Sequence, residues 1–321
     1  TPWGMAFLPN GDILVTEKRG QLRVIRNGNL MEEPIKEVPA VFTRSQAGLF
    51  DLQLHPDYAK NGWIYISYAA PSDQPDVKGG ATTIMRAKLK DHTLVEKQIL
   101  FQGKPFSNEG VHFGARMEFD KDGYLFFSIG DRGEMKLAQQ LDKYNGKVYR
   151  IKDDGSIPSD NPFVKDANAI PAIYSYGHRN PQGIALNPTT GELWETEHGP
   201  QGGDELNILQ KGKNYGWPVI TYGIDYDNSI ISKDTVMEGM EQPVYYWDPV
   251  IAPGAIAFYD GPLFPEWSDD LLIATLQAGL VRLDLKDGRV IAEERFDLGL
   301  GRLRDIAVAD DGALWLVTDD S

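Results

Sequence analysis

Residues 5–17 read MAFLPNGDILVTE: a short alternating apolar segment, a Pro-Asn-Gly-Asp turn and a second apolar segment. Asn-Gly and Asp-Gly turns between alternating segments are the strongest local signal for a β-hairpin. The pattern returns five times, at residues 52–68, 117–131, 184–197, 256–276 and 306–320. Because one motif recurs along the whole chain, the sequence predicts an all-β structure built from internal repeats.

The spacing of the six copies gives the size of the repeated unit. Equivalent positions are 46, 65, 67, 72 and 50 residues apart; they are Leu8, Leu54, Phe119, Leu186, Phe258 and Val308. A four-stranded sheet of about this size, with a loop, is the unit of a β-propeller. We therefore predict that residues 1–321 form a single domain, a six-bladed β-propeller with four-stranded antiparallel blades. The alternative is a β-sandwich whose turns resemble one another by chance.

Composition excludes several kinds of protein. No segment approaches the roughly 18 consecutive apolar residues of a membrane span. The net charge of −15 argues against nucleic acid and anionic membranes as partners, because both favour a basic face. Cysteine is absent, which excludes disulfides, thiolate metal sites and a cysteine nucleophile. The chain starts at Thr1 without Met, as a processed or trimmed chain does, and we expect it to be periplasmic or secreted.

Polar residues stand just before the first strand of four repeats, where a propeller gathers them around its axis. They are Arg44 and Gln46, then His112 and Arg116, then Arg179, Asn180 and Gln182 in SYGHRNPQGIALNP (175–188), and finally Arg302 and Arg304. Arginine binds carboxylates and phosphates through paired donors, so these arginines predict a site for a small polyanion. In the alternative interpretation each arginine pairs with a nearby aspartate such as Asp305.

His112 is the first candidate for a general base. Gly110 and Gly114 leave room for its ring, and an unperturbed histidine titrates near pH 6.5. His178 is the second candidate, and its alternative role is structural.

The segment ETEHGPQGGDELN (195–207) is a candidate calcium site. It places Glu195, Glu197, Asp204 and Glu205 around glycine-containing turns. Carboxylate and carbonyl oxygens suit Ca²⁺, although the spacing is not that of an EF-hand. The alternative is a solvated acidic turn.

At these residues the whole chain resembles the soluble pyrroloquinoline quinone (PQQ)-dependent aldose sugar dehydrogenases, relatives of soluble quinoprotein glucose dehydrogenase. The most specific segments are GHRNPQG (177–183), EHGPQGGDE (197–205), KNYGWPVITYG (213–223) and QPVYYWDP (242–249). The resemblance implies oxidation of aldose sugars at C1 to lactones, with PQQ and Ca²⁺ as cofactors. It also implies an external electron acceptor, and we expect a monomer or weak dimer.

The resemblance implies roles for individual residues. His112 matches the general base, and Arg179 would stabilise the developing negative oxygen. The residues that match PQQ contacts or lie in the matching segments are Gln46, Arg179, Asn180, Gln182, Tyr226, Thr275, Leu276, Gln277, Arg302, Leu303 and Arg304. The implied Ca²⁺ ligands are Gly199 and Pro200 through their carbonyls, and Glu205 and Tyr215 at a further site.

Two positions depart from the pattern of the family. Val111 stands where the glucose dehydrogenase branch has an aspartate before the base, which favours the broader aldose branch. Gln277 stands where a lysine often contacts PQQ, so we expect weaker cofactor binding.

Two other functions compete with sugar oxidation. A Ca²⁺-dependent lactonase or esterase propeller would use the metal and His112 without a quinone, but it gives no reason for three convergent arginines. A non-enzymatic propeller would use the axial polar groups only to solvate a channel. A propeller fold by itself does not distinguish these functions.

Overall fold

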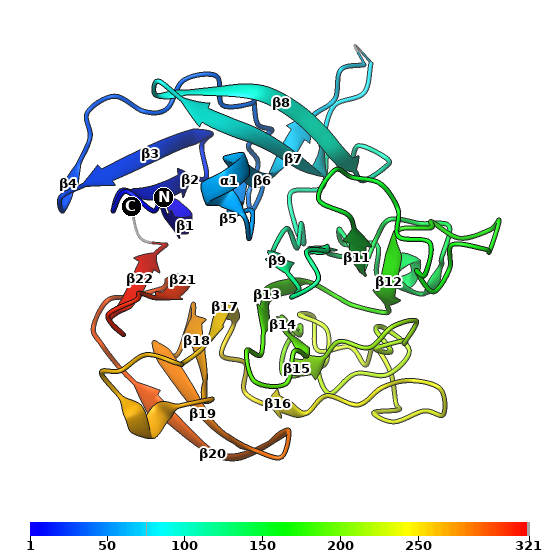
Figure 1. The fold of residues 1–321 in the computed structure, drawn as a ribbon. Coiled ribbons are helices and arrows are strands. Elements are labelled where there is room, and N and C mark those ends of the chain that lie inside the picture. The colour runs from blue at the N-terminus through cyan, green and yellow to red at the C-terminus, as the bar shows by residue number, and fades with distance from the viewer. Residues whose placement is uncertain (75, 320–321) are drawn as a thin grey trace.

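Antiparallel sheets are arranged radially around a central axis, as in a β-propeller (Figure 1). The structure is a computed structural model that describes residues 1–74 and 76–319. Within these residues no helix has the length and apolar character needed to cross a membrane. Each sheet is a meander of strands consecutive in the sequence, which confirms that the repeats are local hairpin units.

Strands make up nearly all the regular structure. The first two blades comprise β1 (Pro2–Phe7), β2 (Ile13–Glu17), β3 (Gln21–Arg26), β4 (Asn29–Leu30), β5 (Leu49–Leu54), β6 (Trp63–Pro71), β7 (Gly80–Lys90) and β8 (Thr93–Gln102). The next two comprise β9 (Met117–Phe119), β10 (Leu125–Ile129), β11 (Lys147–Ile151), β12 (Ile173–Tyr176), β13 (Pro181–Leu186), β14 (Leu193–Glu197), β15 (Asp204–Ile208) and β16 (Tyr245–Trp247). The remaining strands are β17 (Pro253–Phe258), β18 (Leu271–Thr275), β19 (Leu280–Lys286), β20 (Arg289–Phe296), β21 (Leu303–Val308) and β22 (Leu314–Thr318). The helices are α1 (Tyr58–Asn61) and the 3₁₀ turns η1 (Met135–Gln139) and η2 (Pro265–Trp267).

The structure shows five four-stranded blades, so the prediction of six is wrong. The sixth repeat forms only the two-stranded sheet of β21 and β22, which lies between β17 and β1 (Figure 1). The described residues provide no third strand for this sheet: β1 is already the innermost strand of the first blade, and β22 ends at Thr318, one residue before the last residue that the structure describes. The hairpin motif marks only the inner two strands of a blade, so counting motifs overestimates the number of complete blades.

The cores lie between neighbouring blades. One cluster joins Leu14 and Leu22 of the first blade to Ile64 and Met85 of the second. Another packs Trp194 of the fourth blade edge-on against Phe258 of the fifth. Burying each large apolar side chain contributes about 1.5–3 kcal/mol, so the interfaces between blades hold the ring together.

The inner strand of five sheets pairs irregularly with its neighbour near its first residue. The register shifts between Pro2 and Gly4, Leu49 and Leu52, Pro181 and Gly183, Pro253 and Ile256, and Leu303 and Asp305. A β-bulge leaves a residue unpaired and redirects its side chain. Four residues within these bulges, Trp3, Phe50, Gln182 and Arg304, line one cavity. The bulges therefore bring side chains from several blades to a shared site.

Candidate active site

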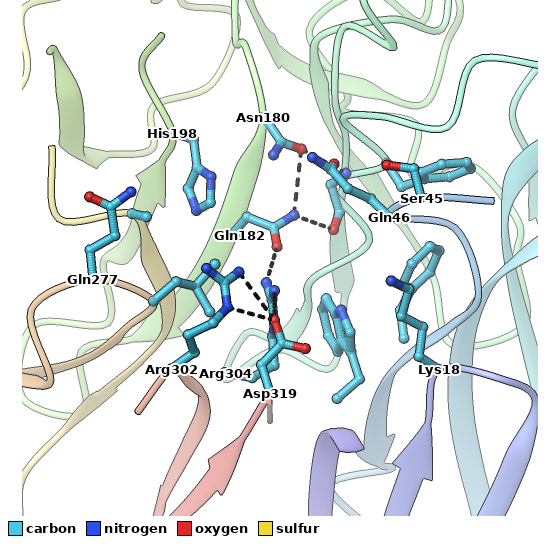
Figure 2. Close-up of a pocket in the computed structure, with 16 residues that line it drawn as sticks. Lys18, Ser45, Gln46, Asn180, Gln182, His198, Gln277, Arg302, Arg304 and Asp319 are labelled. Atoms are coloured by element: carbon cyan, nitrogen blue, oxygen red, sulfur yellow. Dashed lines mark hydrogen bonds and ion pairs between the residues drawn. The ribbon is translucent and has the colours of Figure 1, made fainter. Parts of the chain in front are cut away.

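A cavity of about 370 Å³ lies where the bulged strands meet. Most of its polar lining was predicted from the sequence: Gln46, Asn180, Gln182, Gln277, Arg302 and Arg304, together with Leu276. In Figure 2 the Arg302–Arg304 pair faces Gln182 and Asn180, and Gln46 and Lys18 lie on the opposite wall. The fold therefore supports the prediction that these segments converge on one cavity. The chemistry of the lining indicates which ligand the cavity would bind.

Two arginines dominate one wall of the cavity. Arg304 donates to Gln182 Oε1 at 3.0 Å and to Asp319 Oδ2 at 2.7 Å, and Arg302 reaches the same Asp319 oxygen at 3.3 Å. Asp305, the alternative partner considered above, instead accepts from Arg116 at 2.9 Å. The two arginines thus share a single carboxylate, which leaves the wall with a net positive charge.

The lining fits a flat anionic ligand. Arg304 Nε is buried without a hydrogen-bond partner among the described residues, so a ligand oxygen would satisfy it. Lys18 adds a third cation, and Trp3, Phe50 and Phe113 provide aromatic surface. A carboxylated aromatic ligand such as PQQ matches this combination of charges and rings.

The ring of His112 is held by Asp131. The two residues form a 2.6 Å contact between His112 Nδ1 and Asp131 Oδ1, and Trp217 Nε1 donates to Asp131 Oδ2 at 2.8 Å. Burial by itself would raise the pKa of Asp131, but the hydrogen bond and charge of His112 and the charge of Arg179 lower it below its usual value. An ionised carboxylate only accepts, so Nδ1 carries the hydrogen and Nε2 keeps the free lone pair that a base needs.

His112 does not itself line the cavity, but its neighbours do. Phe113 and Gly114 form part of the wall, and the His112 backbone N–H donates to Gln46 Oε1 at 2.8 Å. The histidine side chain is 14% exposed, so part of the residue remains open to solvent beside the cavity.

Arg179 lines neither this cavity nor a second one of about 560 Å³, but it contacts residues of their walls. It donates to the carbonyls of His198 and Gly199 at 2.9 and 2.8 Å, and to Tyr226 Oη at 3.3 Å. The second cavity is lined by Gly199, Pro200 and Tyr226 and shares His198, Ala252 and Gln277 with the first. Burial, and to a smaller extent the charge of Arg304, lower the pKa of His198 to about 3. The His198 ring is therefore neutral.

The side chains of Thr275 and Leu303 point away from the cavity, although both residues lie in segments that match PQQ contacts. Thr275 is buried and its hydroxyl donates to Gly279 O at 2.8 Å. Leu303 is buried in the core between the fifth and sixth sheets. Only their backbone is available to a ligand, because alternation along a strand points their side chains to the other face.

Buried carboxylates gather on the fourth blade, near the predicted metal ligands. Glu195 and Asn207 pair across β14 and β15, as do Glu197 and Glu205, and His178 Nδ1 lies 3.2 Å from Glu197 Oε1. Glu195 Oε1 and Asn207 Oδ1 have no hydrogen-bond partner among the described residues, although both are buried. Burial, reinforced by the charge of Glu197, raises the pKa values of Glu195 and Glu205. Oxygen donors that lack partners suit a hard cation such as Ca²⁺.

The other predicted metal ligands are placed separately. The ring of Tyr215 stacks on His178 at 4.6 Å, next to the carboxylate cluster, and its hydroxyl donates to Ile208 O. Gly199 N–H donates to Asp204 Oδ1 at 2.8 Å, while the Gly199 carbonyl accepts from Arg179. A carbonyl has two lone pairs, so this hydrogen bond leaves one free for a cation.

Asp131 and Asp319 are site residues that the sequence analysis did not identify. A signal for them exists: an acidic residue ends or closely follows the second strand of several repeats, namely Glu17, Asp131, Glu197 and Asp319. Glu197 accepts from the backbone N–H groups of Arg179 and Asn180, as Asp131 accepts from His112 and Asp319 from the arginines. Asp131, Glu197 and Asp319 therefore hold polar residues that lie just before or at the start of the first strand of the same hairpin.

Comparisons with known proteins identify the family of the chain. The family model for glucose/sorbosone dehydrogenase matches residues 1–321. The chain is 41% identical to aldose sugar dehydrogenase YliI of Escherichia coli over 327 residues, which cover 100% of this chain and 87% of the relative. It is 33% identical over 243 residues to quinoprotein glucose dehydrogenase B of Acinetobacter calcoaceticus, covering 68% of this chain and 50% of that protein.

Solved structures show the same arrangement. The apo form of the soluble aldose sugar dehydrogenase of Escherichia coli superposes with a TM-score of 0.95 at 40% identity, covering 99% of this chain and 93% of that one. The PQQ-bound aldose sugar dehydrogenase of Streptomyces coelicolor gives 0.81 at 30% identity, covering 99% and 87%. The chain therefore belongs to the glucose/sorbosone dehydrogenase family, within the soluble PQQ-dependent aldose sugar dehydrogenases that its sequence motifs resemble.

Proposed function

We propose that this protein oxidises aldose sugars at C1 to lactones, with PQQ and Ca²⁺ as cofactors and an external electron acceptor. The observation that carries the proposal is a cavity with a cationic wall whose lining continues directly into the segment that carries the base. Arg302 and Arg304 line the cavity, and so do Phe113 and Gly114, which follow His112 in the chain. Family membership supports the same activity.

The residues of the cavity would bind the cofactor. Arg302, Arg304 and Lys18 would pair with its carboxylates, and Gln46, Asn180, Gln182 and Gln277 would hydrogen-bond its edges. When bound, PQQ supplies the acceptor for two electrons and Ca²⁺ acts as a Lewis acid on it. The backbone at Thr275 and Leu303 would complete the wall.

His112 and Arg179 would act on the sugar. His112 Nε2 would take the proton of the anomeric hydroxyl, and Asp131 would stabilise the imidazolium that forms. Arg179, fixed by the carbonyls of His198 and Gly199, would stabilise the negative charge that develops on the sugar oxygen. Tyr226, 66% exposed above Arg179, would line the approach of the substrate.

Two calcium sites are part of the proposal. Gly199 and Pro200 would offer carbonyls beside the cofactor, and Glu205 with the Tyr215 carbonyl would form a further site. The unpartnered oxygens of Glu195 and Asn207 support a cation in this region. We also propose that residues 1–321 form one domain, that the protein is a periplasmic or secreted monomer or weak dimer, and that it binds neither nucleic acid nor membrane.

The test is a titration of apoprotein with PQQ, with and without Ca²⁺, followed by dye reduction with glucose and other aldoses. Tight, Ca²⁺-dependent binding with sugar oxidation would support the proposal. Lactone hydrolysis that requires Ca²⁺ and ignores PQQ would instead support the lactonase alternative. No binding and no activity would leave the propeller as a non-enzymatic platform.

A further inference from the structure

Arg132 is a buried cation directly after Asp131, and the proposed reaction does not use it. It is 5% exposed, and its guanidinium hydrogen bonds within the described residues all go to backbone carbonyls rather than to a carboxylate. Burial lowers the pKa of Arg132 to about 10, with the charges of Asp131 and Glu109 opposing that shift, so the group remains charged at neutral pH. A buried cation held only by neutral groups is costly and calls for a reason.

The contacts of Arg132 surround the loop that carries His112. Nε donates to Val111 O at 2.9 Å, and one terminal nitrogen donates to Glu109 O at 2.5 Å. The guanidinium lies 3.6 Å over the Phe113 ring. Arg132 therefore contacts the residues on both sides of His112 in the chain. Its remaining nitrogen donates to Gly80 O at 3.3 Å, which ties the loop to the second blade.

The backbone of this loop needs such support. His112 has φ +50° and Arg132 has φ +58°, a left-handed conformation that residues with side chains adopt rarely. Unfavourable backbone conformations persist where surrounding contacts fix them, and they concentrate at functional sites. On the other side, Gln46 accepts from the His112 N–H and its own N–H donates to Gly110 O at 2.8 Å. Gln46 holds one edge of the loop and Arg132 the other.

We propose that Arg132 is a positioning residue that fixes the backbone around His112, so that Nδ1 meets Asp131 and Nε2 faces the substrate. Asp131 and Arg132, adjacent in the chain, then hold the ring and the backbone of the same histidine. The inference rests on the proposed role of His112 as the base. It goes further in assigning a separate function to the arginine, whose planar fork directs its donors at three separate carbonyls, a geometry that the point charge of a lysine does not reproduce.

The experiment compares Arg132→Met and Arg132→Lys with wild type and with Arg150→Met. Arg150 is a matched control, because it is also buried and lies 3.8 Å over a tyrosine ring, Tyr124, without contacting the His112 loop. With PQQ, Ca²⁺ and glucose, we expect kcat of Arg132→Met to fall by about 10- to 100-fold, as misplacement of a reacting group does. KM and PQQ affinity should change little, and Arg132→Lys should recover part of kcat.

A second readout uses apoprotein and needs no activity. The short His112 Nδ1–H···Asp131 hydrogen bond should give a downfield proton resonance, assigned by its loss in His112→Gln. We expect the resonance to weaken or vanish in Arg132→Met and to persist in Arg150→Met. A wild-type resonance and kcat in Arg132→Met, or an equal loss of both in Arg150→Met, would overturn the proposal.

The two proposals fail in different ways. If wild-type protein oxidises no sugar, the proposed function is wrong, while the resonance still decides whether Arg132 positions His112. If Arg132→Met does not fold, Arg132→Lys decides: wild-type kcat and an unchanged resonance would show that the three-carbonyl contact is not needed.

Discussion

The base lies beside the axial cavity and the arginine pair lines it, and the two are held in different ways. Asp131, 1% exposed, accepts from His112, Trp217 and the Gly133 N–H, so its carboxylate is surrounded by fixed donors. Arg302 and Arg304 share only Asp319, and the Arg302 side chain is 48% exposed. The base is thus organised before any ligand arrives, whereas the arginines keep donors available for an anion. Changes in the first region should affect turnover, and changes in the second should affect cofactor affinity.

The largest effect is expected in the base region. His112→Gln keeps similar volume and hydrogen bonding but removes the base, and Asp131→Asn removes the charge that fixes the tautomer. For each we expect kcat to fall by roughly 10²–10⁴, the usual scale for a positioned acid–base group. Dye-linked kcat with glucose measures this, and PQQ affinity of the apoprotein should stay within about twofold.

Sugar oxidation by His112→Gln could also contradict the role of His112 as the base. Near-normal oxidation by His112→Gln would remove His112 from the mechanism and return attention to His178. That residue is fully buried and bonded to Ser175 and Glu197, which makes it a poor base in this structure.

In the arginine region we expect an effect on binding rather than turnover. Arg304→Ala removes a mostly buried charge with an unpartnered Nε, so PQQ affinity should fall about ten- to a hundredfold. The more exposed Arg302→Ala should cost less, because solvent screens its charge. Fluorescence titration of apoprotein measures both, with the KM for glucose at saturating PQQ as the control. Equal affinity in wild type and both variants would contradict the cationic-wall interpretation.

The difference between the regions also explains what the sequence predicts well. Polar residues at strand starts, such as Gln182 and Arg304, are found from a local hairpin pattern, and the propeller then brings them together. Asp131 stands where acidic residues recur after the second strand of a repeat, but its contact with His112, 19 residues away, is seen only in the structure. The outer strands carry no motif, so the incomplete sixth sheet was not predicted either.

Bulges are a second feature that sequence patterns do not predict. Strict alternation places the side chain of Gln182 on the same face as Ile184, whereas the shift between Pro181 and Gly183 turns it to the cavity. The pattern located the strand correctly. It could not show which residue the irregular pairing leaves free.

A smaller effect, on stability, is expected at Lys147, which contacts a residue that hydrogen-bonds Asp131. Lys147, fully buried, donates to Leu137, Ala138 and Asn145 carbonyls, and Asn145 Nδ2 donates to Asp131 O at 2.9 Å. Burial lowers the pKa of Lys147 to about 7, against an ordinary value of 10.5. Between these values the unfolded chain binds more protons, so this group makes the free energy of unfolding rise with pH, by at most about 1.4 kcal/mol per unit.

Chemical denaturation at pH 7, 8 and 9 measures this contribution. The free energy of unfolding of wild type, relative to that of Lys147→Met, should increase as pH rises. Lys143→Met changes an exposed lysine nearby and is the control, which should show the same pH dependence as wild type. A difference between wild type and Lys147→Met that is constant with pH would show that the ammonium keeps its proton throughout.

The smallest effect is expected at the outer edge of the arginine region. Gln277 is exposed where the cavity meets the second cavity, and the family resemblance matches it to a position often held by lysine. Gln277→Lys would add a cation facing an anionic ligand, but solvent reaches the position, so the gain is about 1 kcal/mol or about fivefold in PQQ affinity. The gain should shrink as salt increases, because screening weakens exposed charge pairs. Gln277→Met, which adds no charge, is the control. An affinity that does not rise at any salt concentration would mean that residue 277 points away from the bound cofactor, and the cationic wall would then end at Arg302.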